Sequence, residues 1–197
     1  MALLGTAFFP TALRFPSGWR RLVLSAVLLA VRPLAAAESP AAPEYQLKAA
    51  FLFNFTQFVE WPAVAFADAQ APFVIGVLGD DPFGAVLDET VRGETVGGRP
   101  LLVQRYRKAE DIKACHVLFI SKSEAAGLER IVAALKDRNV LTVGDTEGFA
   151  RRGVLVRLVT EDKKIRLHIN ADAAKAVGLV LSSKLLRLAE LVTPGKD

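Results

Sequence analysis

Apolar and polar positions alternate along the chain with two different periods, and each change of period marks an expected element. Short apolar runs bounded by turn residues predict buried strands, whereas apolar residues recurring every three to four positions predict helices with one buried face. The expected strands span residues 73–78, 100–106, 116–121 and 140–143, followed by a hairpin with strands at 154–160 and 164–169. The expected helices span residues 44–58, 82–91, 122–135, a short segment capped by Asn170, and 182–192.

This order of elements predicts an α/β fold. Strands that alternate with helices favour a sheet with helices on both faces. The hairpin at 154–169 adds an antiparallel pair, expected at an edge, so the sheet is mixed. We therefore expect residues 44–192 to form a single-domain three-layer α/β/α sandwich, followed by a C-terminal tail at 193–197.

The expected helix at 44–58 is rich in aromatic residues. At 100° per residue, one face holds Leu47, Phe51, Asn54, Phe55 and Phe58. We expect Phe51 and Phe58 to be core residues. Asn54 would then be a buried structural amide, which must bond to a neighbouring backbone because an unsatisfied buried amide costs about 1–3 kcal/mol.

A further aromatic residue lies on the polar side of the same helix. Phe53 falls among polar residues, and an aromatic on a polar face can mark an interface. The residues expected at a partner interface are Phe53, Gln57, Glu60 and Trp61. The alternative is that Phe53 packs against another element of the sandwich, since single exposed apolar residues need no explanation.

The first 37 residues have the composition of a secretory leader. They contain four arginines and no acidic residue, an apolar run at 22–31, and three alanines at 35–37. A basic segment, a short apolar run and small residues at the cleavage position are the parts of a signal peptide. The apolar run is shorter than the about 20 residues that span a bilayer. We expect cleavage before Glu38 and a periplasmic protein without stable membrane insertion; the alternative is an uncleaved amphipathic or membrane anchor.

The leader carries the whole excess of positive charge. The chain has 25 Lys and Arg residues against 21 Asp and Glu residues, a formal net charge of +4. Without the leader's four arginines, 21 basic residues face 21 acidic ones. A neutral domain that lacks a basic stripe is not expected to bind nucleic acid. Residues 38–43 form the expected Pro/Ala linker between the leader and the domain.

The one cysteine of the chain, Cys115, stands beside His116. A nucleophile near a base can indicate covalent catalysis, but adjacent residues on a strand point to opposite faces. Nothing in the sequence brings His168 close, and the three residues lack the spacing of zinc ligands. We expect Cys115 to be a buried structural residue, and we expect no catalytic and no metal site.

Three aspartates follow apolar strands at their carboxyl ends: Asp80, Asp81 and Asp145. Ligands bind at this edge in open α/β sheets, and clustered carboxylates there can hold Mg²⁺. Aspartate is also the expected residue at strand-to-helix turns and helix caps, which is the interpretation we favour. The three loops remain a candidate ligand edge. No cofactor is expected, because the glycine-containing stretches lack a phosphate-loop pattern.

Four segments of the expected domain carry a more specific pattern, at residues 45–62, 77–84, 114–121 and 165–191. The second reads Val-Leu-Gly-Asp-Asp-Pro-Phe-Gly and the third reads Ala-Cys-His-Val-Leu-Phe-Ile-Ser. The segments occur in order and at similar spacings in one family. Together they resemble the YfiR-like (HmsC-like) periplasmic regulatory proteins over nearly the whole domain.

The resemblance implies a non-enzymatic periplasmic repressor. Its implied partner is the periplasmic part of an inner-membrane diguanylate cyclase or related sensor, and the contact would control cyclic-di-GMP and biofilm formation. Many relatives have a cysteine one residue before the position of Val77, paired with the one at Cys115. Here that position is Gly76, so the resemblance implies that disulfide-based redox control is absent or intermolecular in this chain.

The sequence also allows alternative hypotheses for the interface and for the function. A homodimer is one alternative for the interface residues. The alternative function is a periplasmic small-molecule-binding module that feeds a sensor or transporter through the loops at Asp80 and Asp145. An enzyme of unknown chemistry would depend on Cys115 and the carboxylates alone.

Overall fold

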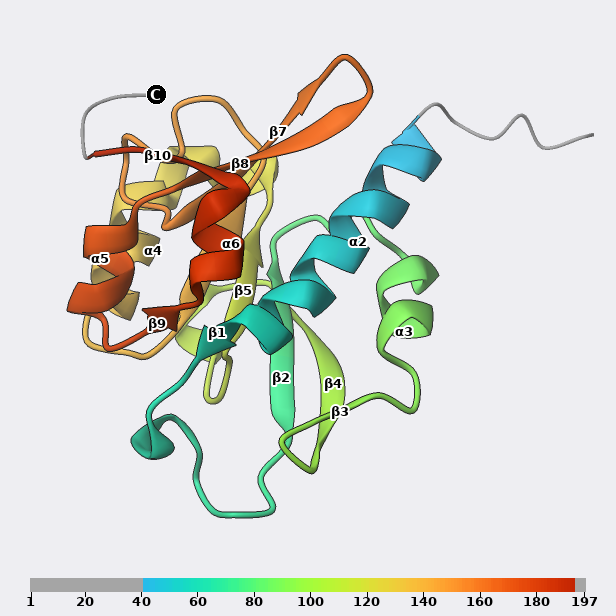
Figure 1. Cartoon of the computed structure of the whole chain (residues 1–197), viewed down its shortest axis with the longest axis vertical. Helices are drawn as coiled ribbons and strands as arrows, with labels where there is room; N and C mark the ends of the chain where they lie inside the picture. The colour runs from blue at the N-terminus through green and yellow to red at the C-terminus, as the bar shows by residue number, and fades with distance from the viewer. Residues whose placement is uncertain (1–40, 194–197) are drawn as a thin grey trace, which may run out of the picture. The chain divides into compact units, whose positions relative to one another are not determined.

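The computed structural model describes residues 41–193, in which helices and strands alternate (Figure 1). The expected leader, residues 38–40 of the expected linker and residues 194–197 lie outside the described residues. The helices are α2 (Ala41–Phe58), α3 (Ala85–Val91), α4 (Leu128–Leu135), α5 (Ala171–Ala176) and α6 (Ser183–Arg187), with 3₁₀ turns η1 (Ala63–Ala65), η2 (Ala109–Asp111) and η3 (Lys122–Gly127). The strands are β1 (Val59–Glu60), β2 (Phe73–Leu78), β3 (Thr95–Val96), β4 (Arg99–Tyr106), β5 (Val117–Ile120), β6 (Leu141–Gly144), β7 (Val156–Glu161), β8 (Lys164–Ile169), β9 (Val180–Leu181) and β10 (Ala189–Leu191).

An eight-stranded mixed sheet runs through the described residues in the order β10-β8-β7-β6-β5-β2-β4-β3. The strands from β4 to β7 in this order are parallel. The pairs β7–β8 and β3–β4 are antiparallel. A separate antiparallel pair, β1 with β9, joins the end of α2 to the segment after α5. The expected α/β class and mixed sheet are confirmed.

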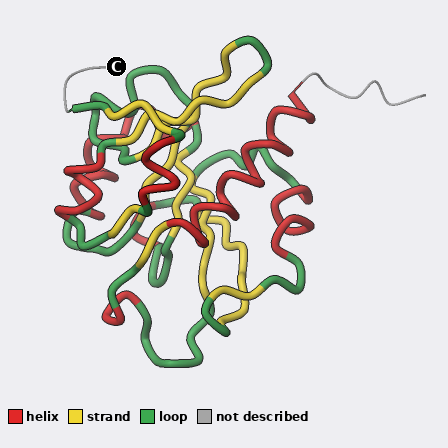
Figure 2. Tube along the Cα trace, in the orientation of Figure 1, coloured by secondary structure: helices red, strands yellow, loops and turns green. Residues whose placement is uncertain are grey.

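Each face of the sheet has its own core. Alternate residues of a strand point to opposite faces, so Val117 and Phe119 of β5 pack in the core that includes α2, α3 and α6. Leu118 and Ile120 pack in the core that includes α4. In Figures 1 and 2 helices lie on both sides of the strands, with α2 and α6 in front and α4 behind. The expected three-layer architecture is therefore present.

The C-terminal part differs from the helix expected at 182–192. Helix α6 ends at Arg187, and β10 pairs in parallel with residues 167–169 of β8. An unpaired strand edge exposes backbone N–H and C=O groups, and the three extended residues of β10 satisfy those of β8. The hairpin of β7 and β8 exists as expected, but the prediction that it forms the edge is wrong, because β10 lies outside it.

Helix α2 begins at Ala41 and buries a face that differs from the predicted one. The residues of α2 that are no more than 3% exposed are Lys48, Ala49, Leu52, Phe55 and Thr56. The hydrophobic pattern does not identify this face as buried, because it contains the polar residues Lys48 and Thr56. Both are satisfied: Thr56 Oγ1 donates to Phe53 O at 2.7 Å, and Lys48 forms two ion pairs.

The predicted apolar face of α2 consequently faces outward in part. Phe51 and Phe58 are partly buried and pack against the core instead of lying within it. Leu47 is 43% exposed. The expectation of a buried Asn54 amide is wrong, because the side chain is exposed and water can satisfy it.

Candidate partner-binding groove

The carboxyl edge of the sheet holds a largely buried ion-pair network around Asp145, which follows β6. Its Oδ2 accepts hydrogen bonds from Lys48 Nζ at 2.6 Å and from Tyr45 Oη at 3.0 Å. Lys48 also pairs with Glu44 at 2.5 Å, and Thr160 Oγ1 donates to Glu44 at 2.7 Å. Burial raises the pKa of Tyr45, with a further contribution from the Asp145 carboxylate, so the phenol stays protonated. The network ties α2 to β6 and β7.

The other two aspartates of the expected ligand edge have different surroundings. Asp81 accepts a hydrogen bond from Phe83 N at 2.7 Å and pairs with Arg105 at 2.8 Å. Arg105 binds Asp88 as well, and Asp80 is exposed. Among residues 41–193, no three His, Cys, Asp or Glu side chains lie together in a way that could hold a metal ion. Within this edge, Asp81 and Asp145 already pair with cations of the same chain.

The residues considered for covalent chemistry lie apart. Cys115 is 6% exposed, and burial raises the pKa of its thiol to about 12, so the reactive thiolate is scarce at neutral pH. His116 packs in the opposite direction, where its Nε2 lies 3.2 Å from Ala65 O. His168 lies on β8, 3.5 Å from Glu190, and two strands separate β8 from β5. The structure thus brings no histidine to Cys115 as a general base.

The four residues expected at a partner interface divide into two kinds. Phe53 and Trp61 are partly buried and pack against the core. The Trp61 ring meets Phe73 edge-on at 4.8 Å. Gln57 and Glu60 are exposed. An interface role for these four residues stays a prediction.

A groove lies along the predicted apolar face of α2, which is called the apolar stripe below, and its other walls come from β8 and α6. Two hollows follow it. One has a volume of about 350 Å³ and is lined by Pro43, Glu44, Leu47, Thr160, Lys163 and Ile165. The other has a volume of about 70 Å³ and is lined by Phe51, Asn54, Phe55, Phe58, Leu167, Lys184, Leu185 and Leu188.

The two hollows belong to one surface. Leu47 and Phe51 are one helical turn apart on α2. Ile165 and Leu167 alternate onto the same face of β8. We call the surface formed by the lining residues of both hollows the α2 groove.

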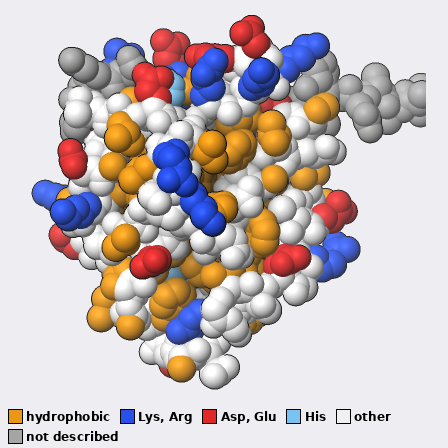
Figure 3. Space-filling view, viewed as in Figure 1, with side chains coloured by type: hydrophobic (Ala, Val, Ile, Leu, Met, Phe, Trp, Pro, Cys, Tyr) orange, Lys and Arg blue, Asp and Glu red, His pale blue; other side chains and the backbone are white. Residues whose placement is uncertain are grey.

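The α2 groove is largely apolar, and leucines within and beside it meet solvent. Leu188 is 76% exposed and Leu191, on the neighbouring β10, is 60% exposed. Hydrophobic side chains gather in Figure 3 over the region where Figure 1 draws α2 and α6, with Lys and Arg side chains among them. Lys163 and Lys184 line the two hollows. A contiguous apolar surface with a charged rim is typical of a protein-interaction site.

The hydrophobic pattern of the sequence identifies the apolar stripe that lines this groove, but it predicts that the stripe is buried in the core. Hydrophobic periodicity identifies an apolar face and does not say whether its partner is in the same chain. Asn54, an amide in the middle of the stripe, is the one signal that the face meets water.

Comparison with known proteins places these observations in a family. The sequence profile of the family described as YfiR/HmsC-like matches residues 45–190, which contain nearly all of the sheet and the α2 groove. No curated protein matches the chain. Within residues 41–193, no helix combines the length and the apolar character needed to cross a membrane.

One similar solved structure is the crystal structure of a conserved domain protein from Vibrio cholerae O1 biovar El Tor strain N16961. The two chains are 16% identical, and the match covers 79% of this chain and 60% of that one with a TM-score of 0.49. This chain therefore spans less than two thirds of the length of that solved chain.

Proposed function

Because the chain belongs to the YfiR/HmsC-like family, a family of periplasmic regulators, we propose that it acts by binding another protein of the cell envelope. The proposed partner is the periplasmic part of an inner-membrane diguanylate cyclase, which the contact holds inactive. Loss of the contact then raises cyclic-di-GMP and biofilm formation. The α2 groove is the observation that carries this proposal. Removing an exposed apolar surface from water lowers the free energy, so such a surface favours binding of a partner.

The lining of the groove indicates the chemistry of the partner segment. A long apolar channel beside a helix accepts an amphipathic segment whose apolar side chains enter the hollows. Leu188 is the most exposed leucine at this surface. Lys163 and Lys184 favour a segment with acidic residues at its flanks, because complementary charge speeds encounter and excludes other partners.

The proposal includes export and excludes a catalytic step. The leader expected at residues 1–37 would deliver the domain to the periplasm, where such a partner lies. A regulator that works by contact needs no activated nucleophile, and the protonated, buried Cys115 is compatible with that role. The ion pairs of Asp81 and Asp145 are compatible with structural roles for these carboxylates.

A cellular experiment tests the proposal. Deleting the gene should raise cyclic-di-GMP and biofilm, and a plasmid copy should restore both. Leu188→Asp places a charge on the exposed leucine of the α2 groove and should fail to restore repression at normal protein levels. Val64→Asp is the matched control, because Val64 is 83% exposed and lies on η1 outside the groove. Unchanged cyclic-di-GMP after deletion, or full repression by Leu188→Asp, would overturn the proposal.

A further inference from the structure

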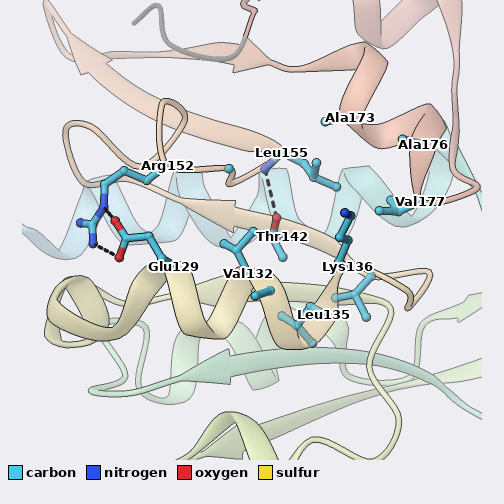
Figure 4. Close-up of a pocket in the computed structure, with 13 residues that line it drawn as sticks. Glu129, Val132, Leu135, Lys136, Thr142, Arg152, Leu155, Ala173, Ala176 and Val177 are labelled. Carbon is cyan, nitrogen blue, oxygen red and sulfur yellow. Dashed lines mark hydrogen bonds and ion pairs between the residues drawn. The ribbon is translucent and has the colours of Figure 1, made fainter.

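A separate cavity lies between α4 and α5, beside the core that packs under α4 (Figure 4). Its volume is about 360 Å³, which falls in the range of about 300–1,000 Å³ typical of small-molecule sites. Thr142 of β6 and Leu155 lie between the two helices in Figure 4, Val132 and Leu135 come from α4, and Val177 follows α5. Thr142 is directed to the α4 side, because its neighbours in β6 belong to the core on the α2 side.

The lining of the cavity extends along α4. Its wall includes Glu129, Val132 and Ala133 of α4 and Lys136, which directly follows the helix; these residues share one side over two turns, or about 10 Å. Small side chains keep the space open, among them Ala133 of α4. Gly153 does the same at another wall: its φ is 99°, and a Cβ there would lie 2.9 Å from Val132 Cγ1. An apolar lining that extends over about two helical turns suits an alkyl chain.

The charges around the cavity leave one cation without a partner. Arg152 Nε and Nη2 donate to both carboxylate oxygens of Glu129, at 2.6 and 2.8 Å, so this pair is neutral (Figure 4). Lys136, at the opposite end of the α4 face, has no ion pair with any residue of the described part of the chain. The buried Thr142 hydroxyl accepts a hydrogen bond from Leu155 N at 3.0 Å, and its own proton is available to a ligand oxygen.

We propose that this cavity binds a medium-chain carboxylate, with its alkyl chain on the apolar lining and its carboxylate at the Lys136 ammonium. The alkyl chain replaces water on side chains such as Val132, Leu135 and Leu155, which is favourable in proportion to the apolar area covered. Lys136 selects an anionic head group over a neutral or cationic one. The site is independent of the α2 groove, with which it shares no lining residue.

Calorimetric titration of the exported chain, residues 38–197, with decanoate below its micelle concentration tests the inference. Decanol and decyltrimethylammonium are the head-group controls. Wild-type protein should bind decanoate saturably and more tightly than either control. Lys136→Glu should reverse the preference between decanoate and decyltrimethylammonium, and Lys136→Gln should weaken decanoate about fivefold, as expected for an exposed ion pair. Lys136 is exposed, so neither variant should unfold the domain.

A second pair of variants tests the location. Ala133→Trp fills the cavity from α4 and should abolish decanoate binding. Ala134→Trp is the matched control, because Ala134 is exposed on the same helix and does not line the cavity. The inference is overturned if decanoate does not bind saturably, if both tryptophan variants bind it equally, or if decanol binds as well as decanoate and Lys136→Glu changes nothing.

Discussion

Lys48 Nζ lies 2.6 Å from Asp145 Oδ2, and the two side chains are only 4% and 10% exposed. They are 97 residues apart in the chain, one on α2 and the other after β6. The pair holds Lys48 inward, on the same side of α2 as the buried Leu52 and Phe55. With this face turned inward, Leu47 and Phe51 lie along the α2 groove.

Asp145→Ala is predicted to destabilise the protein by about 3 kcal/mol, because removing one member of a buried pair leaves the other charge poorly compensated. Urea denaturation measures the effect. Asp80→Ala is the control: Asp80 is exposed, so its free energy of unfolding should change by no more than about 0.5 kcal/mol. Equal stability of the two variants would show that the pair does not hold α2.

Two neighbouring positions on α2 should respond differently to alanine. Phe55 is 0% exposed, so Phe55→Ala should cost about 3–5 kcal/mol. Asn54→Ala should stay within about 0.5 kcal/mol, because the side chain meets solvent. A large loss for Asn54→Ala in thermal or chemical denaturation would contradict the orientation of α2.

The variant Phe53→Ala distinguishes a role of Phe53 in packing against the core from a role in binding a partner. Phe53 is partly buried against the core, so we predict a lower Tm, with partner affinity reduced only as far as the fold is lost. A normal Tm with weakened partner binding would instead support the interface assigned to Phe53 from the sequence. Calorimetry and a binding assay on the same preparation distinguish the two results.

Because His116 is buried, we predict that the protein loses stability between neutral and mildly acidic pH. Burial lowers the pKa of His116 in the folded protein, whereas the unfolded chain has the ordinary value of about 6.5. As pH falls below 6.5 the unfolded state binds the proton first, so the free energy of unfolding decreases until the folded pKa is reached. The neutral ring is held in place by Val74 N, which donates to Nδ1 at 3.0 Å, and by Ala65 O at Nε2.

Denaturation at pH 7.5 and pH 5.5 measures this effect. His116→Leu should be less stable overall because it loses both hydrogen bonds, yet its stability should fall less between these two pH values. The lowered pKa of Glu44, caused first by its hydrogen bond from Lys48, acts at more acidic pH and does not overlap. The same decrease in both proteins would exclude His116 as its source.

Gly76→Cys is predicted to form a disulfide with Cys115. A Cβ placed on Gly76 would lie 2.7 Å from Cys115 Sγ, so the two thiols would meet after small movements of Tyr106 and Leu118, which approach the same point at 2.8 and 2.9 Å. Thiol counting of the oxidised, denatured variant should find no free cysteine. Two free thiols after oxidation would contradict the geometry, and Gly76→Ser controls for the added volume.

Some elements of the fold could be predicted from the sequence and others could not. The buried strand at 73–78 was predicted with its observed bounds, because a continuous apolar run between turn residues has few alternatives. The strand at 189–191 was not, because its backbone pairs with a free edge of β8 that local sequence does not reveal. The buried face of α2 was missed because Lys48 is polar, and its burial depends on a pair with Asp145, far along the chain, as well as on the pair with Glu44.

The most direct test of partner binding through the α2 groove is the dissociation constant between purified residues 38–197 and the periplasmic domain of the proposed cyclase partner, measured for three proteins. Leu188→Asp should bind at least about tenfold more weakly than wild type, a loss of about 1.4 kcal/mol, while Val64→Asp should bind like wild type. Equal affinities for all three proteins, or no binding by any of them, would contradict a partner-binding role for the groove.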